Sequence, residues 1–320
     1  MDLIHPTISL VIPTYNRAGL IAATLESALA QVPPFFEIIV VDDGSSDYTS
    51  SVLAPYADRV MVIHVENGGV QRARNLGVAA ASGTFVALCD SDDLFAPGYV
   101  ATMQNWFHLH PACNSVYCNF VTFDDDTVHA DKFSTAPLGY FDGAVRTGAF
   151  WEEVPDLYER TLLFQPLFPS GSIIRRSLYL ELNGYDSRFN GVGAEDYEYA
   201  LRVVEAGGVA LCTDALIRIR RHGSNDSTDT LRQVRGEIQI LEHALTHHRS
   251  ATLYRRSIIT SIEARRLDVF NGAFARGKFD IAVQALDALI TAPIDSKFRL
   301  KALITRLPSI LRHPLWRLTQ

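Results

Sequence analysis

Short apolar segments alternate with segments of helical periodicity through the first two thirds of this 320-residue chain. The apolar segments are rich in Val and Ile and end in turn-forming residues, as buried strands do. The expected strands are 8–12, 37–41, 60–65, 84–89, 113–123, 171–174, 209–212 and 216–220, and the expected helices are 20–31, 68–81, 97–110, 177–182 and 195–206. This alternation predicts parallel βαβ units in an α/β fold, an open, mostly parallel twisted sheet with helices on both faces.

Charge divides the chain into two parts. Residues 231–320 contain 15 Lys and Arg and 7 Asp and Glu, out of 29 and 36 in the whole chain, which leaves 14 bases and 29 acids for the rest. Beyond residue 228 the pattern is helical, while the segment 124–168 is irregular and rich in aromatic residues. We therefore expect one α/β domain over 1–228, with a loop-rich insertion, and a basic all-helical region over 229–320.

Composition excludes several classes of protein. Apolar residues make up 48% of the chain and charged residues 20%, which excludes wholesale disorder. The net charge of −7 argues against a general nucleic-acid binder, which would carry a basic surplus. The four cysteines form no close C-x-x-C pair, so we expect reduced thiols and a cytoplasmic protein.

Four polar clusters follow directly after expected strands. They are Pro13–Asn16, Asp42–Asp43, Glu66–Gly68 and Asp90–Asp93. Ligands of open α/β sheets bind beyond the carboxyl ends of the strands. We therefore expect the four clusters to meet at one edge of the sheet and to form the functional site there.

The last cluster has the composition of a metal site. Asp90, Asp92 and Asp93 place three carboxylates within four residues, and these repel one another unless a cation is present. Mg²⁺ and Mn²⁺ prefer such oxygen ligands and commonly bridge to a substrate phosphate. The alternative is an acidic, solvated turn that caps a helix. The neighbouring polar clusters favour the metal.

Other charged residues admit both a functional and a structural interpretation. Arg72 and Arg74 begin a helix, where cations oppose the helix dipole, so a nearby pyrophosphate would explain them. Exposure or salt bridges to the acidic clusters would explain them equally. Asp43 could accept a hydrogen bond from a nucleobase, or it could belong to a capping turn. Glu195 and Asp196 are ordinary dipole partners at a helix start unless a ligand meets them.

Five stretches taken together resemble the family 2 glycosyltransferases, inverting nucleotide-sugar enzymes with a GT-A fold. The stretches are Val11–Arg17, Val41–Asp47, Gly69–Gly77, Cys89–Asp93 and Gly193–Asp196. Their order and spacing make the resemblance far more specific than any single motif, and it covers about residues 9–227. The insertion and the basic tail fall outside the shared pattern.

The resemblance implies a role for each matching residue toward a nucleoside diphosphate sugar, with a UDP-sugar favoured. Pro13 and Tyr15 would flank the base and ribose, and Asp43 would accept the N–H of the base. Arg74, in preference to its neighbour two residues earlier, would lie near the phosphates. Asp90 would contact the ribose or the sugar.

The resemblance also implies the catalytic and metal-binding residues. Asp92 would bind Mn²⁺ or Mg²⁺ directly, and His222 matches a histidine that in some members helps to hold the metal or the diphosphate. Asp196 would be the general base that activates a hydroxyl of a glycan or lipid-linked acceptor, and Glu195 would support it. A direct displacement with inversion requires two things. The leaving diphosphate needs the positive charge of a metal ion, and the attacking hydroxyl needs a general base.

Two other functions compete with sugar transfer. A nucleotidyltransferase also combines an α/β nucleotide site with acidic metal ligands, but its glycine- and lysine-rich loop after the first strand is missing here. A non-catalytic nucleotide- or carbohydrate-binding module would have no need of both Asp92 and Asp196. Aromatic residues of the insertion could stack on acceptor sugars or form a core; they are Tyr140, Phe141, Phe150, Trp151 and Tyr158.

The basic tail has two interpretations. Leucine and isoleucine recur at helical spacing among cations between residues 297 and 317, with Pro308 and Pro314 expected to interrupt a long helix. Such a segment could make peripheral contact with the anionic inner face of a membrane. Its apolar face could instead pack on the catalytic domain or on a second subunit in a homo-oligomer.

Overall fold

The structure is a computed structural model that describes residues 6–124, 127–223, 229–291 and 293–319. It divides into two compact units, Met1–Gly191 with Glu195–Asn225, and Val192–Ala194 with Asp226–Gln320. We call the first the α/β unit and the second the helical unit. The boundary expected after residue 228 falls at the edge of residues 224–228, which lie outside the described residues.

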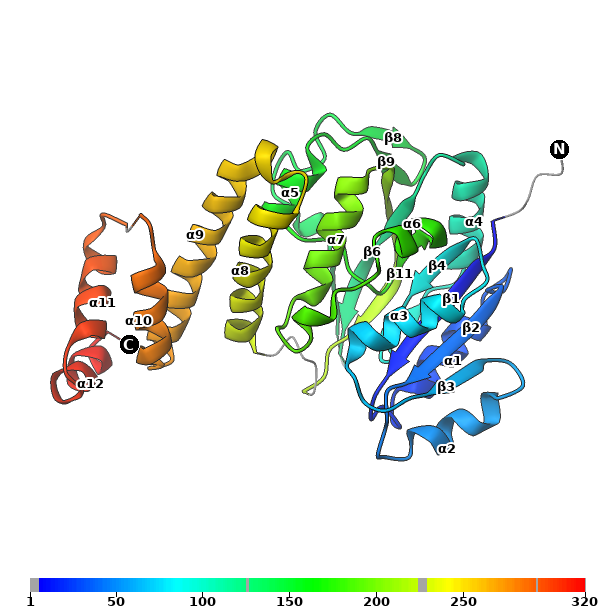
Figure 1. The fold of residues 1–320 in the computed structure, drawn as a ribbon, viewed down its shortest axis with the longest axis horizontal. Helices are drawn as coiled ribbons and strands as arrows, with labels where there is room; N and C mark the ends of the chain where they lie inside the picture. The colour runs from blue at the N-terminus through cyan, green and yellow to red at the C-terminus, as the bar shows by residue number, and fades with distance from the viewer. Residues whose placement is uncertain (1–5, 125–126, 224–228, 292, 320) are drawn as a thin grey trace. The chain divides into compact units, whose positions relative to one another are not determined.

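The α/β unit is built on a sheet of eleven described strands (Figure 1). Nine form the order β3-β2-β1-β4-β10-β6-β11-β9-β8, while β5 pairs with β11 and β7 pairs with β6. The strands are β1 (Ile8–Thr14), β2 (Glu37–Asp42), β3 (Met61–His64), β4 (Phe85–Leu88), β5 (Leu94–Phe95), β6 (Ser115–Phe123), β7 (Val128–Asp131), β8 (Val145–Thr147), β9 (Phe150–Glu152), β10 (Ser172–Arg175) and β11 (Val209–Arg220).

The longest strand ladders are parallel. β1 pairs in parallel with β2 and β4, β2 with β3, and β6 with β11. The α/β prediction is therefore confirmed. Antiparallel pairs occur as well: β10 lies antiparallel between β4 and β6, and the short strands β5, β7, β8 and β9 also pair antiparallel with their neighbours. The two strands expected at 209–212 and 216–220 are one strand, β11, whose pairing with β6 shifts register between Cys212 and Ala215 and again before Ile217. Such bulges let a strand continue through polar residues.

Helices cover both faces of this sheet, and α3, α6 and α7 lie in front of it in Figure 1. The α-helices of the unit are α1 (Ile21–Leu29), α2 (Thr49–Leu53), α3 (Val70–Ala80), α4 (Tyr99–Leu109), α5 (Leu157–Leu163), α6 (Arg176–Glu181) and α7 (Glu195–Ala206), and the 3₁₀ turns are η1 (Ala54–Tyr56), η2 (Phe133–Thr135) and η3 (Ser187–Phe189).

The alternation of side chains along β1 builds the two layers. Leu10 and Ile12 pack with Leu25 of α1 and Met103 of α4 in one large apolar cluster. Val11 points the other way, toward α3, where Gly77 permits close approach. A Cβ on Gly77 would lie only 2.3 Å from Val11 Cγ1, so any larger residue would push α3 off the sheet. The glycine thus sets how closely α3 approaches the strand ends.

The insertion at 124–168 is more regular than expected. It contains β7, β8, β9, η2 and α5 among its described residues. Tyr140, Phe150 and Tyr158 are each at most 6% exposed, and Phe150 stacks on Trp106 of α4 with ring centroids 3.9 Å apart. These three aromatic side chains therefore form core, which leaves them little surface to offer a sugar.

The helical unit consists of consecutive helices. They are α8 (Thr230–His247), α9 (Ala251–Ala275), α10 (Phe279–Ala288), α11 (Ser296–Arg306) and α12 (Ser309–Arg317). Its main core cluster joins residues of α8, α9, α10 and α11 around Phe270, which is fully buried. Pro308 stands between α11 and α12, as expected of a residue that interrupts a long helix, whereas Pro314 lies inside the nine-residue α12. Of the helices that the structure describes, none is both long and apolar enough to span a bilayer.

Candidate active site

The loops that follow β1 and β2 are fastened to each other. Asn16 has a left-handed backbone conformation (φ 51°), and its side-chain oxygen accepts a hydrogen bond of 2.8 Å from the backbone N–H of Ser46. In return, the N–H of Asn16 donates to Ser45 Oγ at 2.9 Å. Pro13, near the end of strand β1, is buried, whereas Tyr15 keeps 46% of its surface exposed. The exposed Tyr15 ring is thus held at the carboxyl edge of the sheet.

The two successive aspartates at the end of β2 have different partners. Asp42 is 2% exposed and accepts hydrogen bonds from Ser45 N, Ser50 Oγ and His64 Nδ1. Burial acts to raise the pKa of Asp42, but these hydrogen bonds outweigh it and leave the pKa lowered. Asp42 is therefore a structural carboxylate that stabilises the turn.

Asp43 connects this turn to the start of α3. Its two carboxylate oxygens accept hydrogen bonds from the backbone N–H groups of Gly68 at 2.9 Å and Gly69 at 2.8 Å. The residue is 3% exposed. A carboxylate oxygen has two lone pairs, so each can accept one further hydrogen bond. The residue predicted to meet the base therefore also fixes the loop that begins α3.

Arg74 is the arginine that the fold builds into the site. Its guanidinium donates to Asp90 Oδ1 at 2.7 Å and lies 5.0 Å from the centre of the Tyr185 ring. Burial works against its charge, but Asp90, Tyr185 and Glu195 together leave its pKa raised. Its Nε and Nη1 are buried, and no described group accepts a hydrogen bond from them. A buried cation with two unused donors suits an anionic ligand.

Arg72, the other candidate, has a different environment. Its side chain is exposed, and its Nη1 donates to the backbone oxygen of Glu66 at 2.8 Å. This bond fixes the loop that precedes α3. Of the two arginines, it is Arg74 that lies beside the acidic cluster.

Asp92 and His222 lie 130 residues apart in the sequence and are brought together by the fold. Asp92 Oδ2 lies 3.0 Å from His222 Nε2 and 3.6 Å from Arg17 Nε. The Asp92 and His222 side chains are 12% and 18% exposed. Across the described ranges, no group of three or more His, Cys, Asp or Glu side chains could hold a metal ion. A carboxylate and an imidazole at this distance could supply two of the ligands of a divalent cation.

The third aspartate of the acidic cluster points into the protein. Asp93 is 3% exposed, accepts a hydrogen bond from Ser170 Oγ at 2.5 Å, and accepts another from the N–H of Arg220 at 3.0 Å. Its pKa is raised well above the usual range, first by burial and then by the charges of Asp90 and Asp92. Asp93 therefore ties the loop after β4 to β11.

Glu195 and Asp196 begin α7, and Asp196 is half-buried. Burial and then the neighbouring charge of Glu195 raise the pKa of Asp196 to about 7, with Arg74 opposing the rise and Asp90 adding to it. The charges of Arg74 and Asp90 therefore reach Asp196, which belongs to the same site. A carboxylate that titrates near neutrality is suited to accept a proton at physiological pH.

Sequence analysis missed one polar residue on the buried face of α3. Gln71 is 1% exposed, and neither its side-chain oxygen nor its nitrogen has a hydrogen-bond partner among the described groups. It lies one turn before Arg74, on the same side of the helix. The spacing of Gln71, Arg74 and Val78 (i, i+3, i+7) is the sequence signal that places all three on this buried face. Gln71 was missed because its amide is neutral and the candidates were chosen mainly by charge.

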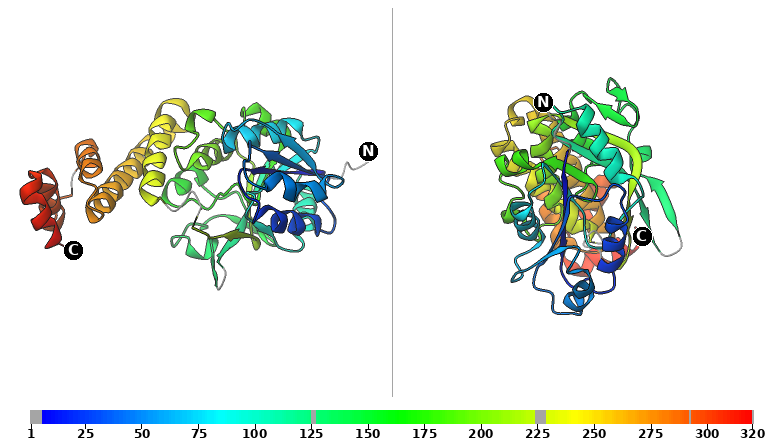
Figure 2. Two further views of the ribbon diagram at one scale, coloured as in Figure 1. Left: turned by 90° about the horizontal axis from the view of Figure 1, so that it is seen from below. Right: turned by 90° about the vertical axis from the view of Figure 1, so that its right-hand side faces the viewer.

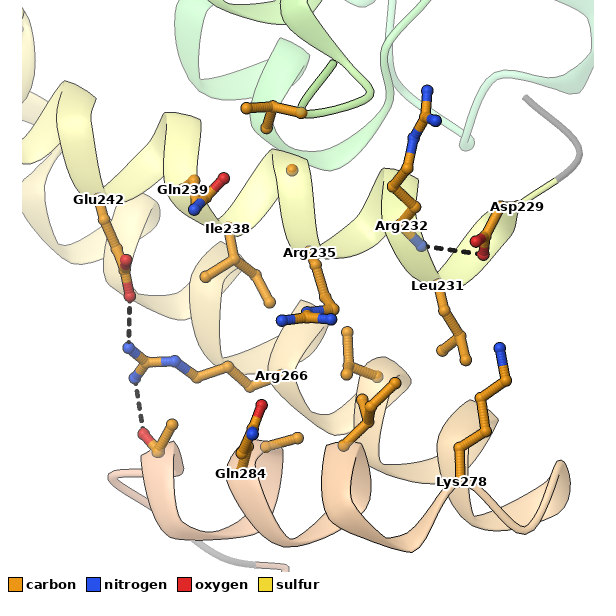
Figure 3. Close-up of a pocket in the computed structure, with 16 residues that line it drawn as sticks. Asp229, Leu231, Arg232, Arg235, Ile238, Gln239, Glu242, Arg266, Lys278 and Gln284 are labelled. Atoms are coloured by element: carbon orange, nitrogen blue, oxygen red, sulfur yellow. Dashed lines mark hydrogen bonds and ion pairs between the residues drawn. The ribbon is translucent and has the colours of Figure 1, made fainter. Parts of the chain in front are cut away.

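A hollow lies within the helical unit (Figure 3). It has a volume of about 440 Å³ and is lined by side chains of α8, α9 and α10. Arg235 of α8 and Lys278, which precedes α10, line it, while Arg266 donates hydrogen bonds to Glu242 and to the backbone oxygen of Ala288. None of the residues predicted for the functional site lines this hollow.

Comparison with known proteins identifies the α/β unit. The model of the family described as "Glycosyl transferase family 2" matches residues 9–179. YwdF of Bacillus subtilis, an uncharacterized glycosyltransferase, is 30% identical over 225 residues, which are 69% of this chain and 78% of that protein. An uncharacterized glycosyltransferase of Rickettsia typhi is 26% identical over 72% of this chain and 68% of its own length. By contrast, the chain covers only 48% of EpsH of Bacillus subtilis, at 34% identity.

Solved structures show the same fold at low sequence identity. Staphylococcus aureus TarS, residues 1–349, has a TM-score of 0.62 at 18% identity, over 98% of this chain and 92% of that chain. The same TarS fragment in complex with UDP-GlcNAc has a TM-score of 0.65 at 17% identity, over 97% and 89%. These likenesses show the GT-A fold with its helical extension. Together with the family match over more than half of its length, they establish that this chain belongs to glycosyl transferase family 2.

Proposed function

We propose that this glycosyltransferase moves a sugar from a nucleoside diphosphate sugar, with UDP as the favoured nucleotide, to a hydroxyl of a glycan or lipid-linked acceptor. The carrying observation is the grouping of Arg74, Asp90 and Asp196 within mutual electrostatic reach, with a pKa of about 7 for Asp196. The UDP-GlcNAc complex of TarS supports the donor class. The name of a relative, a putative teichuronic acid biosynthesis glycosyltransferase of Bacillus subtilis, supports a polysaccharide acceptor.

We assign the donor to the carboxyl edge of β1, β2 and β4. Tyr15 has an exposed ring for the base or ribose, with Pro13 as a rigid neighbour. Asp43 keeps lone pairs for a base N–H, as described above. The two unused donors of Arg74 would bind phosphate oxygens. Asp90, whose side chain is 38% exposed, could accept hydrogen bonds from ribose or sugar hydroxyls.

Asp92 and His222 are the residues that would hold Mn²⁺ or Mg²⁺. When bound there, the cation would supply positive charge against the diphosphate as it leaves. Arg17 lies beside the same carboxylate, at 3.6 Å, and adds a fixed positive charge from the protein itself.

Asp196 then performs the proton transfer. Its carboxylate would remove the proton from the acceptor hydroxyl while that oxygen forms a bond to the anomeric carbon. The bond from the anomeric carbon to the diphosphate oxygen breaks in the same step, and the nucleoside diphosphate leaves with the electron pair. One displacement of this kind inverts the anomeric centre. Glu195, beside Asp196, helps to keep the pKa of the base near neutrality.

The test is to identify the product from a panel of UDP-, dTDP- and GDP-sugars, each with Mn²⁺ or Mg²⁺. Glycosyl transfer releases the free nucleoside diphosphate, and Asp196→Asn abolishes the release while nucleotide-sugar binding persists. Asp58→Asn, at an exposed position, is the matched control and keeps full activity. Release of pyrophosphate would identify a nucleotidyltransferase instead. Binding of sugars without any turnover would identify a binding module.

A further inference from the structure

The last helix of the helical unit is anchored by Arg312 and Trp316, which pack against aromatic residues of that unit. Trp316 Nε1 donates a hydrogen bond of 2.7 Å to the backbone oxygen of Phe274, and its ring meets Phe279 edge to face. The guanidinium of Arg312 lies 4.4 Å from the centre of the Phe279 ring. Arg312 and Trp316 are four residues apart and share one side of α12. That side is the one that anchors the helix.

The other side of α12 carries apolar residues that remain exposed. Leu311, Leu315 and Leu318 follow one another at i, i+4 and i+7, so they form a single stripe. They are 54%, 41% and 84% exposed, and Ile310 beside them is 81% exposed. An isolated exposed leucine needs no explanation, but a stripe of four apolar residues on one short helix indicates a binding surface.

The preceding helix shows the same arrangement. Phe298 and Ile304 of α11 are buried in the helical unit, while Leu300 and Leu303 are 51% and 61% exposed. Figures 1 and 2 show α11 and α12 side by side at the end of the helical unit that is far from α8, and α11 contacts α10. We call the six exposed apolar residues of these two helices the leucine surface. They are Leu300, Leu303, Ile310, Leu311, Leu315 and Leu318.

The charges around the leucine surface have one sign. Between residues 296 and 319 the sequence contains six cations and neither Asp nor Glu. Arg306 pairs with Asp287 of α10 at 2.7 Å, and Lys301 donates to Asn271. Lys297, Arg299 and Arg317 are exposed, and no ion pair joins them to any residue that the structure describes. Exposed apolar side chains among unpaired cations are the signature of a helix that lies on an anionic bilayer.

We propose that α11 and α12 bind the surface of an anionic lipid bilayer, with the leucine surface entering the interfacial region and the cations meeting the lipid phosphates. The charge argues against a second copy of this chain as the occupant. A symmetric dimer places the same patch on both sides of the interface, so it would bring these cations against one another with no acid between them. A bilayer containing anionic lipid supplies the missing negative charge.

Vesicle sedimentation of the full chain tests the proposal. The protein should sediment with vesicles of phosphatidylglycerol and phosphatidylcholine at about 0.01 M salt, where the Debye length is about 30 Å, and much less at about 1 M. It should not sediment with phosphatidylcholine alone. The double variant Leu311→Glu and Leu315→Glu should bind at least about tenfold more weakly.

The matched control introduces the same charges elsewhere. Leu138→Glu with Leu163→Glu changes two leucines of the α/β unit that are 107% and 74% exposed, and it should bind vesicles like the original protein. Equal binding by both double variants, or equal binding to neutral vesicles, would overturn the proposal. The proposal would also be overturned if the protein did not bind vesicles and instead formed a dimer, seen by light scattering, that the Leu311→Glu and Leu315→Glu variant abolished. Neither result bears on the proposed transferase activity, which is measured separately.

Discussion

Replacing Asp196 with Asn should change stability and activity together, because the same half-buried carboxylate is responsible for both. Its pKa is raised to about 7 from a reference value of 3.8, first by burial and then by Glu195. A raised pKa in the folded protein means that ionisation of this carboxyl opposes folding. The penalty is absent below pH 4, grows as the pH rises, and is complete above about pH 7.

The size of the effect follows from the shift. Each pKa unit corresponds to about 1.4 kcal/mol, so the full difference is on the order of 4 kcal/mol. Because Asp196 keeps some contact with solvent, we expect about half of this, near 2 kcal/mol. For a unit of this size, 1 kcal/mol changes the melting temperature by about 2–4 °C. As the pH rises from 4.5 to 7.5, the melting temperature of Asp196→Asn should therefore rise by about 4–8 °C relative to that of the original protein.

The assay compares thermal unfolding of both proteins across this pH range and then compares their transfer rates. All other titratable groups are common to the two proteins, so the difference in melting temperature isolates position 196. The rate constant of Asp196→Asn should fall by about 10²–10⁴, while kcat/KM of the original protein should decline below about pH 7 as the base is protonated. A melting difference that does not vary with pH, or normal turnover by the variant, would refute this account of Asp196.

Three further substitutions test other parts of the α/β unit. Gln71→Met removes a buried amide that has no described partner, so the free energy of unfolding in a urea titration should rise by about 1–3 kcal/mol. Nucleotide-sugar binding should weaken. Unchanged binding would show that the amide does not contact the donor. Glu198→Ala leaves Arg202, its partner at 2.6 Å, without a carboxylate, and should lower the free energy of unfolding by about 3–5 kcal/mol, whereas an unchanged urea midpoint would contradict a structural role. Asp92→Ala should weaken donor binding, measured by calorimetry, at least about tenfold in the presence of Mn²⁺ and only slightly in the presence of a chelator. An equal loss of affinity under both conditions would show that Asp92 contacts the donor rather than a metal ion.

Local pattern was sufficient to predict the layout of the α/β unit. Strand and helix periods are properties of neighbouring residues, and parallel strands necessarily bring their carboxyl ends to one edge. That is why Asp43, Arg74 and Asp92 could be named as candidates before any coordinates were known. The antiparallel direction of β10 could not be predicted, because strand direction depends on how the preceding insertion returns the chain to the sheet.

The sequence could not distinguish the roles of neighbouring acids. Asp42 and Asp43 are adjacent and chemically identical, yet one stabilises its own turn while the other bonds to the start of α3. Likewise Asp93 points toward Ser170 while Asp92 faces His222. Both distinctions depend on contacts with residues 25 to 130 positions away, which no local pattern contains.

The bonds from Asp43 to Gly68 and Gly69 have a thermodynamic consequence for the proposed donor complex. A nucleobase that draws on the same carboxylate changes how strongly the first turn of α3 is restrained, and α3 carries Arg74 toward the phosphates. Affinity for the base and affinity for the diphosphate are then coupled quantities, and their separate contributions to binding will not add. Exchanging uracil for another base would therefore also change the affinity of the protein for the diphosphate, several bonds away from the base.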